Sequence, residues 1–158
     1  MGLFGRKKTT PQEQQPEPVV VETAEELHAL QAAQFVSFAE ESIGIAAGVL
    51  NFKSESLNVV DEALEEFHRH NIELPQPMWE GISSYIMETA RREYGGSYKP
   101  FQDQNPWVLV IGEPEFNLGF MAMSKVLDRV RNGEEDSIPF FYEGLEPLVR
   151  QKRNATLV

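Results

Sequence analysis

The densest group of residues that could do chemistry lies in the stretch YIMETARREYGG, residues 85–96. At about 100° per residue, a helix places Tyr85, Glu88 and Arg92 along one edge of its apolar face. Glu88 and Arg92 then form an i,i+4 pair in the favourable order. Glu93 falls within the apolar face itself, where a carboxylate needs a cation or backbone amides, or else takes up a proton.

Two interpretations of this group remain open. In the first, Tyr85, Glu88 and Arg92 line a polar cleft beside a β-hairpin, with Trp107 and Lys125 as its walls, and bind a small anionic molecule. In the second, the ion pair is ordinary surface, the last helical turn frays, and the acidic side chain on the apolar face turns into water.

A second charged group occupies residues 125–138, KVLDRVRNGEEDSI. Helical spacing places Lys125, Asp128 and Arg129 opposite the apolar face of their helix. The acids 134–136 follow a glycine, but the alternating ligands of an EF-hand are absent. These acids are therefore expected to favour the N-terminus of the next helix through its dipole.

The histidines do not indicate a metal site. His68 and His70 are two residues apart, which separates their side chains by about 200° around a helix, so they cannot bind one ion together. His28 is alone in its segment. A zinc site would need carboxylates for most of its ligands, which is uncommon.

Composition narrows the classes of function. The chain has 158 residues, a net charge of −11 and no cysteine. The surplus of acids argues against nucleic acid as the main partner, and the lack of cysteine removes disulfides and thiolate chemistry. The sequence contains no P-loop, G-x-G-x-x-G, G-x-S-x-G or H-E-x-x-H motif. We therefore predict no cofactor and no metal, and the balance favours a protein that is not an enzyme.

Residues 1–18 are rich in proline, glutamine and glutamate, and we expect a disordered tail followed by one domain over residues 19–158. No apolar run approaches the ~18 residues of a transmembrane helix. The start, MGLFGRKK, lacks the apolar segment of a signal peptide, so a cytoplasmic protein is predicted. The basic and apolar side chains of residues 2–8 suffice for a weak contact with an anionic membrane surface.

Periodicity and capping residues predict three helices in the first part of the domain. Thr23 and Glu26 form a capping box that opens the first helix. Its buried face is predicted to comprise Leu27, Leu30, Phe38 and, at the edge, Phe35. A second helix begins near Ser54, and a third runs over residues 77–94 with Arg91 on its exposed side.

Strand patterns follow. The apolar run 107–111 and an alternating segment after it predict a hairpin over about 107–120, with a short strand before it at 97–101. Further helices are predicted over about 121–132 and after Ser137. The order of elements indicates an α+β fold, in which N-terminal helices pack on a small antiparallel sheet and C-terminal helices follow.

Several short motifs within about residues 54–138 resemble motifs of a known group of domains. They are Ser56-Leu57 with Val60-Asp61, the stretch 85–96, Asn105-Pro106, and Arg129 with Asn132-Gly133 and Asp136-Ser137. This segment resembles small bacterial domains of uncharacterised function. Many such domains have a glycine and a tryptophan where this chain has Ile86-Met87 and Tyr98. The resemblance implies a bacterial α+β domain and does not point to any activity.

Three functional hypotheses follow. The first, favoured by the lack of catalytic motifs, is a non-enzymatic domain that binds a protein partner through its helices and an open hairpin edge. The second is a small-ligand or enzymatic pocket between helix 77–94 and the hairpin. The third is an immunity or chaperone-like role, in which the acidic domain binds a basic protein through complementary charge.

Overall fold

The computed structural model describes residues 17–158. The helical elements are α1 (Ala24–Phe38) with a π-helical turn after it (Ala39–Ile43), a 3₁₀ turn (Ser54–Ser56), α2 (Leu57–Arg69), α3 (Gln76–Tyr94), α4 (Met123–Asn132), a 3₁₀ turn (Glu134–Asp136), α5 (Ile138–Glu143) and α6 (Leu145–Arg150). The strands are β1 (Ser97–Pro100), β2 (Trp107–Ile111), β3 (Leu118–Phe120) and β4 (Ala155–Leu157). The predicted α+β class is confirmed.

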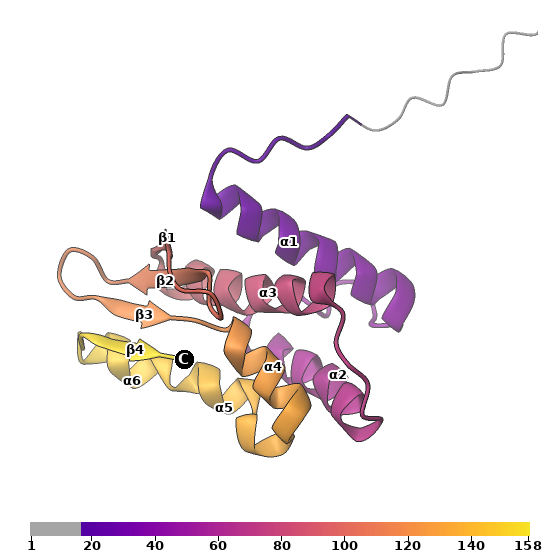
Figure 1. Cartoon of the computed structure of the whole chain (residues 1–158). Helices are drawn as coiled ribbons and strands as arrows, with labels where there is room; N and C mark the ends of the chain where they lie inside the picture. Colours follow the sequence, from indigo (N-terminus) through magenta and orange to yellow (C-terminus); the bar gives the residue numbers. More distant parts are fainter. Residues whose placement is uncertain (1–16) are drawn as a thin grey trace, which may run out of the picture.

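Helix α3 is the central element of the fold. Every residue from Gly81 to Ala90 is buried, because α1 covers one side of α3 while α4 and β2 contact other sides (Figure 1). A Cβ atom on Gly81 would lie 3.0 Å from the Cβ atom of Phe35, so a glycine allows the close approach of α1 and α3 where they cross. The predicted packing of N-terminal helices on the sheet applies only in part, since α2 packs mainly against α4 and α5.

The sheet has the strand order β1-β2-β3-β4. The predicted hairpin is confirmed, with Leu109 opposite Phe120 in an antiparallel pair. The prediction of a purely antiparallel sheet was wrong, because β4 pairs with β3 in parallel. The backbone N–H of Ala155 donates to the carbonyl of Asn117 (3.2 Å), and that of Met121 donates to the carbonyl of Leu157 (3.0 Å). A three-residue strand near the end of the chain carries no periodic signal of its own.

The capping box is confirmed, since the Thr23 hydroxyl accepts from the Glu26 amide (3.2 Å) and the Glu26 carboxylate accepts from the Thr23 amide (3.3 Å). The predicted buried face of α1 was wrong in part. The buried side chains are His28, Ala32 and Phe35, whereas Phe38 is 42% exposed. The apolar residues of α1 surround the helix, so their spacing does not single out one buried stripe.

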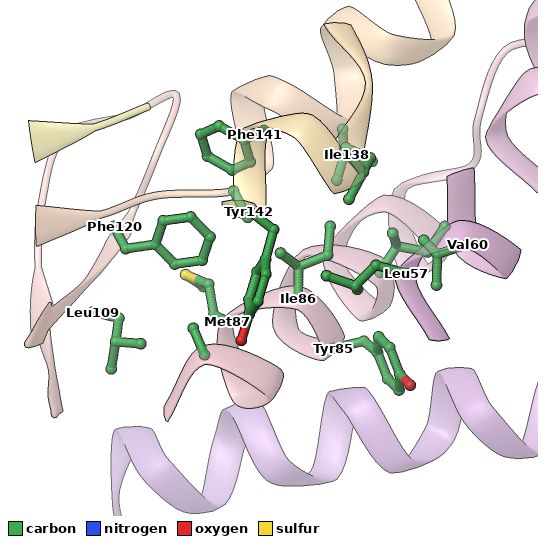
Figure 2. Packing of buried hydrophobic residues seen from close by; sticks show 14 of the residues in the cluster. Leu57, Val60, Tyr85, Ile86, Met87, Leu109, Phe120, Ile138, Phe141 and Tyr142 are labelled. Atoms are coloured by element: carbon green, nitrogen blue, oxygen red, sulfur yellow. The ribbon is translucent and has the colours of Figure 1, made fainter. Parts of the chain in front are cut away.

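One apolar core joins the helices to the sheet. Figure 2 shows α3 side chains between those of α2 and those of the sheet and α5, and the Phe120 and Phe141 rings stack with centroids 5.1 Å apart. The C-terminal helices thus pack on the hairpin. This arrangement fixes the β2–β3 hairpin relative to α3.

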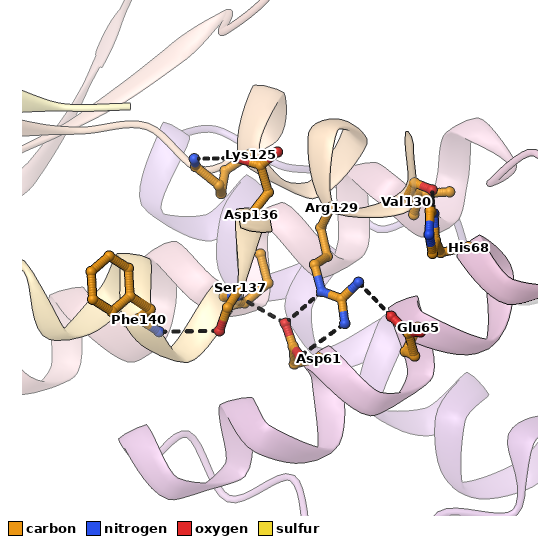
Figure 3. Close-up of polar contacts among 10 residues, drawn as sticks. Asp61, Glu65, His68, Lys125, Arg129, Val130, Asp136, Ser137 and Phe140 are labelled. Atoms are coloured by element: carbon orange, nitrogen blue, oxygen red, sulfur yellow. Dashed lines mark hydrogen bonds and ion pairs between the residues drawn. The ribbon is translucent and has the colours of Figure 1, made fainter. Parts of the chain in front are cut away.

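Arg129 lies inside the fold and not on the surface, which corrects the prediction for this residue. Its side chain is among the largest that are fully buried, at 1% exposure. The guanidinium donates to both carboxylate oxygens of Asp61 (2.9 and 3.1 Å), and its third nitrogen lies 2.7 Å from Glu65 (Figure 3). Asp61 also accepts from the backbone amide of Ile138 at 2.9 Å. The cluster therefore ties α2, α4 and the start of α5 together.

We predict that Arg129→Ala costs about 3–5 kcal/mol of unfolding free energy, because two carboxylates then remain partly buried without their cation. Arg131→Ala is the matched control, since Arg131 lies on the same helix with its side chain 75% exposed. Its cost is expected within about 0.5 kcal/mol. Urea unfolding of the two variants measures both values, and equal costs would contradict the structural role of Arg129.

Candidate functional site

Tyr85, the first residue of the predicted site, is fully buried and bound to the loop before α2. Its hydroxyl accepts from the backbone amide of Phe52 (3.1 Å) and lies 2.6 Å from the hydroxyl of Ser56. Burial raises the pKa of Tyr85. Arg92 stacks over the ring of Phe52, with its guanidinium carbon 3.6 Å from the ring centroid. Both residues therefore hold the 52–56 loop against α3.

Glu88 is 1% exposed and pairs with Arg91, not with Arg92 as the i,i+4 spacing predicted. The Arg91 guanidinium donates to both carboxylate oxygens (2.7 and 2.9 Å), and the Tyr98 hydroxyl of β1 donates to one of them (2.7 Å). Burial acts to raise the pKa of Glu88, but the hydrogen bonds from Arg91 and Tyr98 outweigh it and hold this pKa below its usual value. The carboxylate is thus ionised and neutralised within the chain.

The remaining predicted site residues contact other elements. Glu93 is exposed and accepts from the Tyr142 hydroxyl (2.6 Å), which corrects its predicted position within the buried face. Lys125 pairs with Asp136 at 2.9 Å, and the half-buried Trp107 ring meets His28 edge-on. The structure does not gather these side chains around one cleft. Glu93, Lys125 and Trp107 instead contact different neighbours.

His28 forms a buried polar group with Ser84 and Gln31 that the sequence did not indicate. The Ser84 hydroxyl donates to the Gln31 carbonyl (2.7 Å), so it accepts the proton on Nδ1 of His28 (2.9 Å). The imidazole stacks on Tyr98, with centroids 4.0 Å apart. A cavity of about 80 Å³ adjoins His28 and Trp107. It is far smaller than the roughly 300–1,000 Å³ of small-molecule sites.

Protonation of His28 is expected to weaken the fold. Burial lowers the pKa of His28 to about 4, whereas an unfolded histidine titrates near 6.5. Between these values the unfolded chain binds a proton that the folded chain does not, so stability falls as the pH drops from about 6.5 to about 4, by up to roughly 3 kcal/mol. Glu25 and Glu88 act to raise this pKa and Arg91 to lower it, without overcoming burial.

The measurement is urea unfolding of the wild type and His28→Phe over that pH range. The variant is expected to lose stability less steeply than the wild type as the pH falls, whatever its stability at neutral pH. His70→Phe, which alters an exposed histidine, is the matched control. Parallel pH profiles for the wild type and His28→Phe would exclude the buried imidazole as the cause.

The outer face of α1 carries no charged side chain. It consists of Leu27, Leu30, Ala33, Gln34, Ser37 and Phe38, which are half-buried or exposed. No charged residue occurs from Leu27 to Ala39, a length of about 20 Å along a helix. In Figure 1, α1 lies at the edge of the molecule with α3 beneath it. A helix that is apolar on all sides is normally covered on all sides.

A groove runs beside this face, between α1 and the start of α3. Its volume is about 470 Å³. It is lined by Gln31, Gln34, Phe35, Phe38, Pro75, Pro77, Met78 and Glu80. The lining is mostly apolar and contains no basic residue, so it suits an apolar side chain better than an anionic metabolite. The one sequence signal for this surface is the long gap between charged residues.

Comparisons with protein-family models, with curated proteins and with solved structures find no match for this chain. The resemblance to bacterial domains therefore stays a prediction. Over residues 17–158, no helix is long and apolar enough to cross a membrane. In the same range, no three His, Cys, Asp or Glu side chains are grouped to hold a metal ion. The predicted membrane contact of residues 2–8 lies outside the described residues, as does most of the predicted tail.

Proposed function

We propose that this chain is a non-enzymatic protein-interaction domain, and that its binding surface is the outer face of α1 together with the adjoining groove. The partner contributes an α-helix. The observation that supports this proposal is the uncharged outer face in a chain whose net charge is −11. Solvent-exposed helix faces of acidic proteins ordinarily carry charge, whereas a face that docks a partner excludes it from its centre.

The side chains on this face are arranged for helix packing. Leu27, Leu30 and Phe38 lie within about 80° of one another around α1, and Phe38 also borders the groove. Recognition of a helix by such a surface uses anchors spaced along one stripe. Covering one large apolar side chain completely contributes about 1.5–3 kcal/mol. Several anchors together can therefore offset the entropy lost on association.

The hairpin edge, which the sequence suggested as a binding element, is occupied. β1 flanks β2 and β4 flanks β3, so the hairpin has no open edge of its own. On the outer side of β1, the Tyr98 amide is 3.3 Å from the Glu25 carboxylate, and Pro100 has no N–H to donate. Natural sheets use such features to prevent pairing with another chain. This favours α1 over the sheet as the binding element.

The alternative of a small-ligand or enzymatic pocket receives less support. Glu88 is already neutralised by Arg91 and Tyr98, and Arg92 is stacked on Phe52. The cavity nearest to Trp107 is about 80 Å³ in volume. A metabolite would have to displace these internal contacts before it could bind.

The cysteine-free sequence allows a direct test by thiol labelling. A single cysteine in Leu30→Cys is expected to react readily with a maleimide in the purified protein and several-fold more slowly in intact cells of the source organism, because the partner covers it. Phe140→Cys is the matched control, since Phe140 is 78% exposed on α5. For each cysteine, the labelling rate in cells is divided by the rate in the purified protein. Equal ratios for the two cysteines would mean that the outer face of α1 is uncovered in the cell.

A further inference from the structure

The charges around the outer face of α1 indicate the chemistry of the partner. We infer that the helix that binds there is amphipathic and basic, with Lys or Arg side chains placed over Glu40 and Glu41 at the C-terminal end of the face and over Glu80 in the adjoining groove. This inference rests on the proposed function. The proposed function gives the location of the binding surface, and this inference adds the chemical class of the partner that binds it.

Acidic residues border the uncharged face and no cation of the described chain pairs with them. Glu40 and Glu41 follow it directly in sequence, and Glu80 lines the groove. None of the three takes part in an ion pair within residues 17–158, although most of the arginines and lysines there do. The segment from Ala24 to Ile43 contains no lysine or arginine. This segment therefore supplies no cation to the three acids.

The position of Glu40 and Glu41 is unfavourable for the helix that carries them. The C-terminal end of a helix has a partial negative charge, so cations stabilise it and carboxylates destabilise it. At the other end, Glu25 and Glu26 have structural partners, the Tyr98 amide and the Thr23 amide. Glu40 accepts only from the Gly48 amide (3.1 Å), and Glu41 is exposed. A cation from a partner would remove this repulsion.

The same charges argue against a second copy of this chain as the occupant. In a parallel pair of α1 helices, Glu40 and Glu41 would face their own copies. In an antiparallel pair they would approach Glu25 and Glu26. Both arrangements place like charges together without a lysine or arginine on α1 to offset them, which costs affinity and slows association. A basic partner helix has the opposite effect.

The experiment is selection from a phage-displayed library of helices with a fixed Leu/Ala stripe, in which the flanking positions vary among Lys, Glu and Gln. Immobilised full-length chain is expected to enrich helices with Lys at one end. The double variant Glu40→Gln/Glu41→Gln is expected to lose this preference and to bind a selected helix about fivefold more weakly. The control Glu62→Gln/Glu135→Gln removes the same amount of charge from exposed positions elsewhere. This control is expected to keep the preference for helices with Lys at one end.

The Leu30→Glu variant separates failure of this inference from failure of the proposed function. Enriched helices that need Leu30 but show no preference for Lys would overturn the basic partner and leave the binding surface in place. A Lys preference that the control variant loses equally would also overturn it, because the attraction would then come from net charge alone. If the wild-type chain enriches no helix above the level obtained with Leu30→Glu, both the basic partner and the binding surface on α1 are overturned.

Discussion

The burial of α3 is the constraint on which the rest of the structure depends. A helix whose middle turns are buried on all sides needs another element packed against each side. α1 covers one side of α3, and α4 and β2 contact other sides. The loop before α2 is bonded to Tyr85. Glu88, in the middle of this helix, must then be neutralised inside the protein, because an unpaired buried carboxylate is very costly. Arg91 and Tyr98 meet that requirement.

The same constraint explains why the most charged stretch of the sequence does not form an open cleft. Three polar groups that α3 carries into the core are bonded to elements that cover it: Tyr85 to the loop before α2, Glu88 to β1, and Ser84 to α1. The buried hydroxyls of Ser83 and Thr89 bond instead to backbone carbonyls of α3 itself. The bonds of the first three groups fix how the covering elements sit on α3. These three polar groups are therefore used for assembly, and the surfaces left for partners are the outer sides of the covering elements.

The sequence predicts local structure well and the pairing of charges poorly, for identifiable physical reasons. The capping box at Thr23 and the hairpin at 107–120 follow from residues close together in the chain, and both are present. Arg129 was misplaced because its partners lie 68 and 64 positions away, at Asp61 and Glu65. The choice of Arg91 over Arg92 by Glu88 likewise involves Tyr98, on a strand that periodicity alone cannot place. The composition of α1 was visible, but only the structure distinguishes its covered side from its open one.

The exposed position of α1 links binding to stability. α1 packs mainly on α3 and contacts the sheet at β1 and, through His28 and Trp107, at β2. A partner that binds only when α1 is docked stabilises that docking by mass action. His28, buried under α1 and uncharged at neutral pH because burial lowers its pKa to about 4, opposes docking when it is protonated. If a partner binds the outer face of α1 as proposed, partner binding and proton binding act on the same contact between α1 and α3 with opposite signs, and the bound partner would shift the loss of α1 docking to lower pH.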